Sequence, residues 1–263
     1  MARTLLLRLA VALLAALTAA LGGQARADIV RLAVASNFAE PMQTLAEAFS
    51  AGTGHTLIIS NGSTGRLYAQ IVNGAPFDVF LAADTVRPAR LVEDGLAVAG
   101  SAQTYATGRL ALMEPGDATA GTPSPLQRLQ SGDYRRLALA SPDLAPYGAA
   151  AHQVLAHLDL QTASASRQVF GENIGQTYAF VATGNADLGF VALSQIRHPG
   201  SAPAGRYDLI PAGWHDPIRQ DAVLLERSND NEAARAFLDF LALPEARDII
   251  AAPEGDGATA SAV

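Results

Sequence analysis

Short apolar runs alternate with segments of helical period along most of this chain, and this alternation limits its possible folds more than any other feature. The run IVRLAVA at residues 29–35 predicts a buried strand. Residues 38–49 then carry apolar side chains at helical spacing, and the same order recurs with strands expected at 57–60 and 77–83. Strands that alternate with helices build mostly parallel sheets with helices on their faces. We therefore expect an α/β fold.

A second set of such units begins near residue 110. Strands are expected at 110–113, 137–140 and 188–193, with helical patterns between them. A strand-like segment at 218–226 and an amphipathic helix at 231–243 follow. Two sets of units predict two lobes.

The order of the segments also predicts where the lobes divide. We expect lobe I to comprise residues 28–109 and 213–263, and lobe II to comprise residues 110–212. A chain that leaves the first lobe and returns to it places a cleft between the two. Ligands of open α/β sheets bind outside the carboxyl ends of the strands, where helices begin.

The N-terminus has the order of a secretory signal peptide. Arg3 and Arg8 precede an uncharged apolar stretch at 9–23, and small residues at Ala25 and Ala27 match a cleavage site. The alternative is an uncleaved anchor helix, but the apolar stretch is shorter than the ~20 residues of a bilayer span. We expect residues 1–27 to be removed after Ala27 and the mature protein to be exported.

Charge and cysteine content exclude several classes of partner and chemistry. The chain has no lysine, and loss of Arg3, Arg8 and Arg26 reduces 18 cations to 15 against 25 acids, so the net charge falls from −7 to −10. Nucleic acid is not an expected partner, because its binding depends on clustered cations. The chain also has no cysteine, which excludes disulfides, thiolate metal sites, cysteine nucleophiles and a lipid anchor on cysteine.

Polar residues follow the first two expected strands. Ser36 and Asn37 come after the first, and Gly62-Ser63-Thr64-Gly65 comes after the second. Their backbone N–H, hydroxyl and amide groups are donors at helix starts, which suits an anion. The alternative is that they are ordinary helix N-caps, and Asn37 with Glu40 fits a capping box.

The second set of units has two similar segments. Ala145-Pro146-Tyr147-Gly148 lies after the strand at 137–140, and Asn173-Ile174-Gly175-Gln176 opens a helix. Tyr147 is either a surface aromatic residue or a phenol donor that reaches across the cleft. Ile174 packs its side chain in the core while its N–H is free to face the cleft.

Enzyme and metal signatures do not match. Asn61 to Gly65 is not G-x-S-x-G and has no P-loop lysine. The five histidines lack metal-ligand spacing, and Asp84 is better explained as a helix cap than as an acid. We expect no catalytic residues; an exported serine hydrolase that uses Ser63 is the remote alternative.

The segments together resemble the periplasmic molybdate-binding proteins of molybdate ABC transporters. The resemblance covers essentially the whole mature chain and is carried by the segments AVASNF, TGH, SNGSTG, YAQIVNGAPFDVFLAAD, APYG, ENIGQ and ADLGFVALSQI. It implies a two-lobed periplasmic-binding-protein fold of type II. It further implies a periplasmic protein that captures molybdate or tungstate with neutral hydrogen-bond donors. The protein then delivers the anion to an ABC permease.

The resemblance also carries expectations for the site. Its ligand contacts fall on Ser36, Asn37, Thr64, Tyr147 and the backbone of Ile174, and we add Ser63 and Gly65 as supporting residues. Molybdenum is expected to bind only as the oxyanion, with no side chain as a direct metal ligand. We expect no cofactor and a monomeric protein. Sulfate or another tetrahedral oxyanion is the alternative ligand. The sequence departs from many relatives at Ala192, where they have tyrosine, and in the tail at 253–263.

Overall fold

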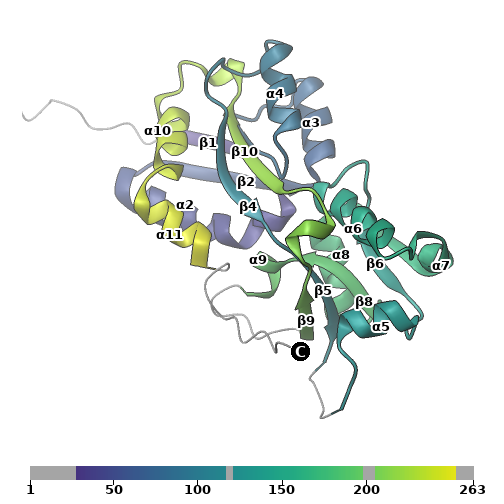
Figure 1. Ribbon diagram of the computed structural model, residues 1–263. Helices are drawn as coiled ribbons and strands as arrows, with labels where there is room; N and C mark the ends of the chain where they lie inside the picture. Colours follow the sequence, from purple (N-terminus) through teal and green to yellow (C-terminus); the bar gives the residue numbers. More distant parts are fainter. Residues whose placement is uncertain (1–27, 117–120, 198–204, 253–263) are drawn as a thin grey trace, which may run out of the picture.

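The computed structural model describes residues 28–116, 121–197 and 205–252, which form two lobes side by side (Figure 1). Each lobe contains one five-stranded sheet. The expected signal peptide at 1–27 and the tail at 253–263 lie outside the described residues. No helix within the described ranges combines the length and apolar character that crossing a membrane requires.

The sheet of lobe I has the order β2-β1-β3-β10-β4. β1 pairs in parallel with both β2 and β3, whereas β10 runs antiparallel between β3 and β4. The strands are β1 (Ile29–Ala35), β2 (Thr56–Gly62), β3 (Val79–Leu81), β4 (Gln103–Gly108) and β10 (Ile218–Leu224).

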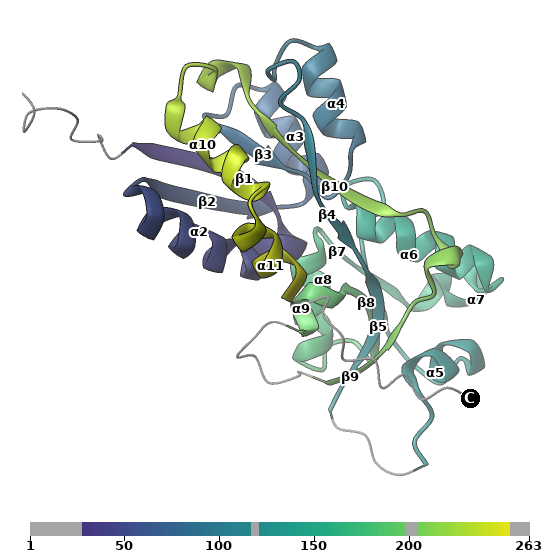
Figure 2. The ribbon, with the colours of Figure 1, turned by 60° about the vertical axis from the view of Figure 1, so that its left-hand side comes forward.

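Helices cover both faces of this sheet (Figure 2). They are α2 (Ala39–Thr53), α3 (Thr64–Val72), α4 (Val86–Glu93), α10 (Glu232–Leu241) and α11 (Pro244–Ala251). α2 buries Met42, Leu45 and Phe49 against the sheet and ends at Gly54, whose φ of 76° is the left-handed conformation that glycine adopts without strain. Phe49 meets Phe237 of α10 edge to face, so both ends of the lobe I sequence share one core.

The sheet of lobe II has the order β7-β6-β8-β5-β9, and β5 runs antiparallel between β8 and β9. The strands are β5 (Leu110–Pro115), β6 (Leu137–Ala140), β7 (Gln168–Gly171), β8 (Leu188–Ala192) and β9 (Gly205–Leu209). The helices are α5 (Pro125–Ser131), α6 (Pro146–His157), α7 (Gln161–Ser164), α8 (Ile174–Ala182) and α9 (Leu193–Ile196).

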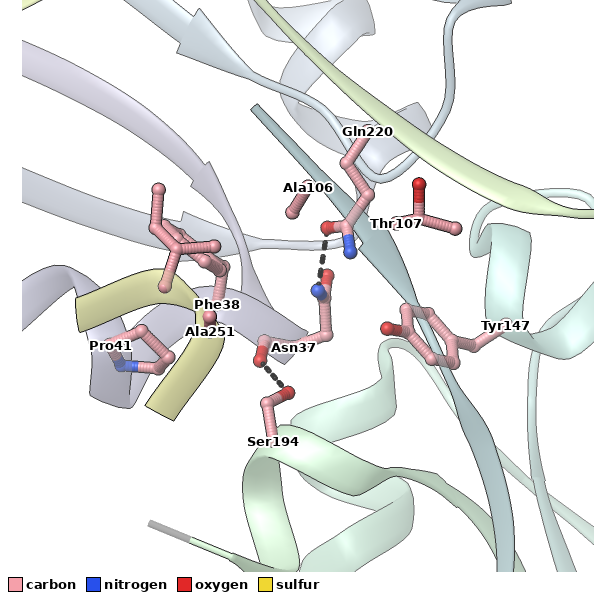
Figure 3. Close-up of a pocket in the computed structure, with 10 residues that line it drawn as sticks. Asn37, Phe38, Pro41, Ala106, Thr107, Tyr147, Ser194, Gln220 and Ala251 are labelled. Carbon is pink, nitrogen blue, oxygen red and sulfur yellow. Dashed lines mark hydrogen bonds between the residues drawn. The ribbon is translucent and has the colours of Figure 1, made fainter. Parts of the chain in front are cut away.

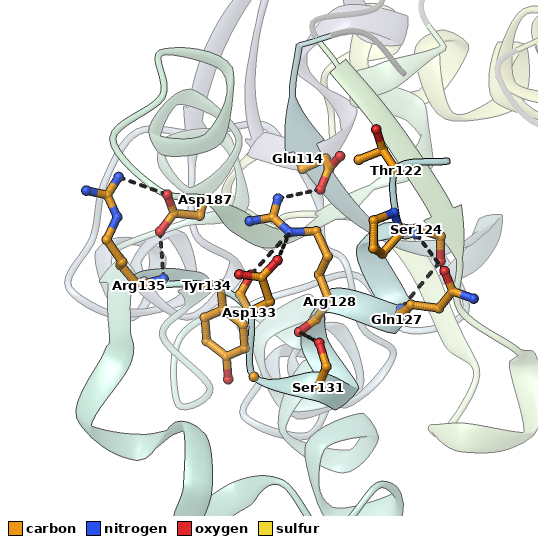
Figure 4. Close-up of polar contacts among 12 residues, drawn as sticks. Glu114, Thr122, Ser124, Gln127, Arg128, Ser131, Asp133, Tyr134, Arg135 and Asp187 are labelled. Atoms are coloured by element: carbon orange, nitrogen blue, oxygen red, sulfur yellow. Dashed lines mark hydrogen bonds and ion pairs between the residues drawn. The ribbon is translucent and has the colours of Figure 1, made fainter. Parts of the chain in front are cut away.

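A buried carboxylate lies near the C-terminal end of β5 in lobe II. Glu114 is 5% exposed and forms ion pairs with Arg128 of α5, at 2.7 Å, and with Arg206 of β9. Burial alone would lower the pKa of Arg128, but the hydrogen bond and charge of Glu114 raise it. Figure 4 shows Arg128 between Glu114 and Asp133. Paired charges are the form in which a buried carboxylate is tolerated.

Two chain segments join the lobes. The first passes from β4 to β5 through Arg109, and the second passes from β9 to β10 through residues 210–217, which include the short 3-10 helix η3 (Ala212–Trp214). Both segments cross from one lobe to the other (Figures 1 and 2). A two-segment connection of this kind permits the lobes to move against each other about a hinge.

The α/β class is confirmed, and each sheet has four strands in one direction with one antiparallel strand, β10 or β5. The expected strand at 77–83 is wrong in extent, because only Val79–Leu81 pairs with neighbouring strands. The strands β4, β7 and β9 were not expected from the sequence.

Candidate functional site

A small cavity lies between the lobes at the carboxyl ends of β1 and β2. Its volume is about 10 Å³, which is far less than the roughly 300–1,000 Å³ of pockets for drug-sized ligands. None of the residues that line it carries a charged side chain: they are Ala35, Ser36, Asn37, Gly62, Ser63, Thr64, Ala83, Ala145, Pro146, Tyr147 and Ile174. The cavity therefore suits a small ligand bound by neutral groups.

The first donors follow β1 in the 3-10 helix η1 (Ser36–Phe38). The alternative interpretation, a capping box of Asn37 with Glu40, is wrong, because Asn37 lies inside η1 and its side chain caps no helix. Its Nδ2 instead donates to Oε1 of Gln220 at 2.8 Å. The Asn37 carbonyl accepts from the Ser194 hydroxyl of lobe II at 2.8 Å, and Figure 3 shows both bonds.

The N-terminus of α3 provides two buried hydroxyl groups. Thr64 is 1% exposed, and its Oγ1 accepts a hydrogen bond from Ala83 N at 3.1 Å. Because the oxygen accepts this bond, the hydroxyl hydrogen remains available to donate into the cavity. Ser63 is the N-cap residue but makes no side-chain cap bond, and its buried Oγ finds no hydrogen-bond partner in the part of the chain that the structure describes.

Tyr147 belongs to the first turn of α6 and is 2% exposed, so the interpretation as a surface aromatic residue is wrong. Pro146 precedes it at a helix start, where the missing N–H of proline costs nothing. The Tyr147 hydroxyl points toward Asn37 (Figure 3). A Cβ added to Gly108 would lie 2.0 Å from the Tyr147 hydroxyl oxygen. Glycine at the end of β4 therefore makes room for the phenol.

The fourth donor segment is the N-terminus of α8. Asn173 caps this helix by accepting from Gln176 N at 3.0 Å, and Ile174 at the first helical position has a buried side chain. The Ile174 carbonyl accepts from Gln195 Nε2 at 3.2 Å, and Gln195 Oε1 accepts from Ala192 N at 3.0 Å. Ala192, where many relatives have tyrosine, is thus part of the backbone support of this helix start.

The electrostatics of the cavity come from helix ends. α3, α6 and α8 begin at its wall, and the N-terminus of a helix carries a partial positive charge. Tyr105 lies behind the wall and donates to Ala82 O at 3.1 Å. Burial, followed by the nearby Tyr147, raises the pKa of Tyr105 well above its usual value. This phenol therefore stays neutral at physiological pH.

Several contacts hold the lobes together around the cavity. The Ser36 hydroxyl of lobe I accepts from Gly175 N of lobe II at 3.3 Å, and Gly65 N donates to Leu144 O at 2.8 Å. Arg66 forms an ion pair with Glu172 across the lobes. The structure is therefore a closed arrangement of the two lobes.

Arg87 and Asp84 form a further pair at the edge of the interface. Asp84 accepts from Arg87 N at 3.0 Å and is ion-paired with the Arg87 guanidinium, so the interpretation of Asp84 as a helix cap is confirmed. Arg87 also donates across the lobes to Asp143 O at 2.8 Å.

Two larger spaces adjoin the small cavity. One, of about 180 Å³, shares Asn37 and Tyr147 with it and is lined mainly by apolar groups (Figure 3). The other is a groove of about 850 Å³ whose charged residues are Asp84, Arg87, Arg90, Asp143, Asp216 and Arg219. The helix N-termini of α3, α6 and α8 converge on the small cavity, which is therefore the better candidate for a binding site.

The structure brings six of the seven residues singled out from the sequence to the wall of one cavity: Ser36, Asn37, Ser63, Thr64, Tyr147 and Ile174. The seventh, Gly65, bonds to the opposite lobe instead. Sequence reasoning missed Ser194 and Gln220, which hold Asn37 from two sides. For Gln220, the signal in the sequence was a glutamine at an inward-facing position of the strand-like segment IRQDAVL. In residues 28–116, 121–197 and 205–252 no group of three His, Asp or Glu side chains is placed to hold a metal ion.

Comparisons with known proteins agree with this architecture. The family described as bacterial extracellular solute-binding protein matches residues 30–252. The chain is 47% identical over 245 residues to the molybdate-binding protein ModA of Azotobacter vinelandii, covering 93% of this chain and 95% of that one. It is 43% identical to ModA of Rhodobacter capsulatus over 235 residues, covering 89% and 91%.

Solved structures give the same result. The structure of a periplasmic molybdate-binding protein of Azotobacter vinelandii superposes with a TM-score of 0.79 at 38% identity and covers 85% of this chain and 97% of that chain. A sulfate-binding protein of Mycobacterium tuberculosis, with a TM-score of 0.72 at 15% identity over 90% and 88% of the chains, shares the fold alone. The chain therefore belongs to the bacterial extracellular solute-binding protein family.

Proposed function

We propose that this protein binds molybdate, and likewise tungstate, in the small cavity between its lobes. The convergence of helix N-termini and neutral donors on one uncharged wall supports this function most directly. The similarity to two molybdate-binding proteins at 47% and 43% identity supports the choice of anion.

Neutral donors are sufficient to hold a dianion in this setting. Hydrogen bonds to a charged group contribute about 1.5–3 kcal/mol each, and the cavity offers hydroxyl donors from Ser36, Thr64 and Tyr147 together with backbone N–H groups. Helix N-termini add favourable partial charge. No salt bridge to the ligand is needed, and no cofactor or direct metal ligand takes part.

The same donors select for the ionisation state of the ligand. A fully ionised tetrahedral oxyanion has only acceptor atoms, which match a wall of donors. Monohydrogen phosphate carries a proton that needs an acceptor, and the cavity lining has no carboxylate to accept it. Sulfate has the same charge and shape as molybdate, so only the size of the cavity separates the two.

Capture and delivery follow from the two-lobed architecture. The exported, monomeric protein binds its anion in the periplasm, and the anion shifts the open and closed populations toward the closed form. An ABC permease then recognises that form. Catalysis is not part of this function: the Ser63 hydroxyl of the remote hydrolase alternative contacts no general base among the described residues.

Titration calorimetry with molybdate, tungstate, sulfate and phosphate tests this function. We expect tight one-to-one binding of the first two and much weaker heats with sulfate and phosphate. Sulfate that binds as tightly as molybdate would instead establish the alternative, a general carrier of tetrahedral oxyanions. An esterase assay of the wild type and the variant Ser63→Ala tests the hydrolase alternative. Turnover by the wild type that is lost in Ser63→Ala would contradict a pure binding function.

A further inference from the structure

Gln220 is a buried polar residue that the binding function described above does not use. It lies on β10, the antiparallel strand of the lobe I sheet, and is 2% exposed. Its Oε1 accepts a hydrogen bond from Asn37 Nδ2 at 2.8 Å and lies 3.2 Å from the Tyr105 hydroxyl, whose single hydrogen is shared with Ala82 O at 3.1 Å. The Asn37 donor on the oxygen fixes the orientation of the amide, so Nε2 points to the other side.

The Nε2 side of Gln220 faces the phenol of the opposite lobe. A Cβ placed on Gly108 would lie 2.9 Å from Gln220 Nε2 and 2.0 Å from the Tyr147 hydroxyl oxygen, so both groups occupy the space that glycine leaves open. Figure 3 shows the Gln220 amide above Asn37, with its nitrogen on the side of Tyr147. One side chain therefore borders an expected ligand donor from each lobe.

We propose that Gln220 is a positioning residue that directs the hydrogens of Asn37 and Tyr147 toward the anion. An amide NH₂ group donates and cannot accept, so the Tyr147 hydroxyl hydrogen turns away from Nε2 and toward the cavity. On the other side, Oε1 takes one hydrogen of Asn37 Nδ2 and holds the amide plane, which leaves the second hydrogen fixed in direction. This role rests on the oxyanion-binding function proposed above.

The consequence is a wall that offers donors only. If position 220 carried an acceptor in place of Nε2, the Tyr147 hydroxyl could donate to that acceptor. The cavity would then have one donor fewer for the ligand. A carboxylate there would also repel the anion. Selectivity for a fully ionised oxyanion thus depends on a residue that is absent from the cavity lining itself.

The variant Gln220→Glu tests this role because it keeps the shape and replaces the NH₂ group with oxygen. Burial raises the pKa of the introduced carboxyl, so it is neutral at low pH and charged at high pH. We expect the molybdate affinity of this variant to fall by at least about tenfold between about pH 5 and about pH 8, while wild-type affinity stays level.

Other ionisable groups near the amide are shared with the wild type. The phenols of Tyr105 and Tyr147 and the carboxylates of Asp84 and Asp221 surround this region. Asp84 is ion-paired with Arg87, and Asp221 accepts from the Thr104 hydroxyl at 2.6 Å. A pH response confined to the variant therefore reports on position 220.

Gln103→Glu is the matched control. Gln103 is on β4 of the same sheet and donates from Nε2 to Leu238 O at 2.6 Å, away from the cavity. Like Gln220→Glu, the variant Gln103→Glu loses an amide hydrogen bond and gains a carboxylate, but we expect its molybdate affinity to stay constant with pH. Gln220→Met, which cannot titrate, should bind at least about tenfold more weakly at every pH and retain a cooperative thermal transition.

The outcomes are distinct. A Gln220→Glu variant that binds molybdate with wild-type affinity at both pH values, or a Gln220→Met variant that binds as the wild type does, overturns the positioning role. A wild type that binds no molybdate contradicts the oxyanion-binding function instead. If Gln220→Glu does not fold, the affinity of Gln220→Met decides the question.

Discussion

Replacement of Thr64 by valine separates the two tasks of its hydroxyl group. Thr64 is 1% exposed and lines the cavity, and its Oγ1 accepts from Ala83 N at 3.1 Å, which leaves the hydroxyl hydrogen available to the proposed anion. Valine preserves the branched shape and removes both bonds. Loss of a hydrogen bond to a charged ligand costs about 1.5–3 kcal/mol, which is about 10- to 150-fold in Kd. The unpaired Ala83 N–H costs a further ~1–3 kcal/mol of stability in the ligand-free protein.

Calorimetry and thermal unfolding of Thr64→Val, Thr64→Ser and the wild type measure these effects. Thr64→Ser keeps the hydroxyl and should bind molybdate within about threefold of the wild type, because only a methyl group is lost. If Thr64→Val bound molybdate as tightly as Thr64→Ser, the hydroxyl would not contact the anion, and the assignment of donors would be refuted.

Three further changes have expected outcomes. Tyr147→Phe should keep the fold and weaken molybdate binding by about tenfold or more in calorimetry, because the ring stays packed while the phenol hydrogen is lost; unchanged affinity would contradict a ligand role for Tyr147. Glu172→Gln breaks an exposed ion pair with Arg66 that only the closed form makes, so affinity should fall by no more than about fivefold at low salt and match the wild type at high salt. Asp187→Asn should lower the free energy of unfolding at pH 7 by about 1–2 kcal/mol in urea titrations.

The effect at Asp187 should also depend on pH in a defined direction. Burial alone would raise the pKa of this carboxyl, but the backbone N–H groups of Arg136 and Arg135 lower it below 3.8. A lowered folded-state pKa stabilises the protein above the unfolded-state value, and this stability is lost as pH falls through the folded-state value. The difference between wild type and Asp187→Asn should therefore be constant above about pH 5 and close in stronger acid. A difference that widens in acid would contradict this reasoning.

The sequence predicted the sheet interiors better than their edges. β6, β8 and the last four residues of β1 are runs of buried residues, so their apolar character is continuous. The strands that were missed, β4, β7 and β9, all lie at sheet edges and are partly exposed. Their polar side chains remove the apolar pattern on which strand prediction depends.

The site residues likewise divide into those that a local sequence pattern predicts and those that depend on tertiary contacts. Ser36 and Thr64 were found because each follows a predicted strand and opens a helix, which is a local pattern. Ile174 opens a predicted helix, but the strand before it, β7, was missed. The support of Asn37 by Gln220 depends on contact between positions 183 residues apart, and spacing along the chain carries no sign of it. For Asn37 the alternative interpretation was a helix cap, and the side chain instead makes a tertiary bond to Gln220.

The position of the bound anion tests the central claim most directly. Crystals grown with molybdate and measured at the molybdenum absorption edge would reveal the metal by its anomalous scattering. We predict one peak in the cavity between the lobes, with an oxygen of the anion within hydrogen-bond distance of Thr64 Oγ1 and another near Ile174 N. A peak in the charged groove beside Arg90 and Arg219 instead, with the cavity empty, would contradict this account of the binding site.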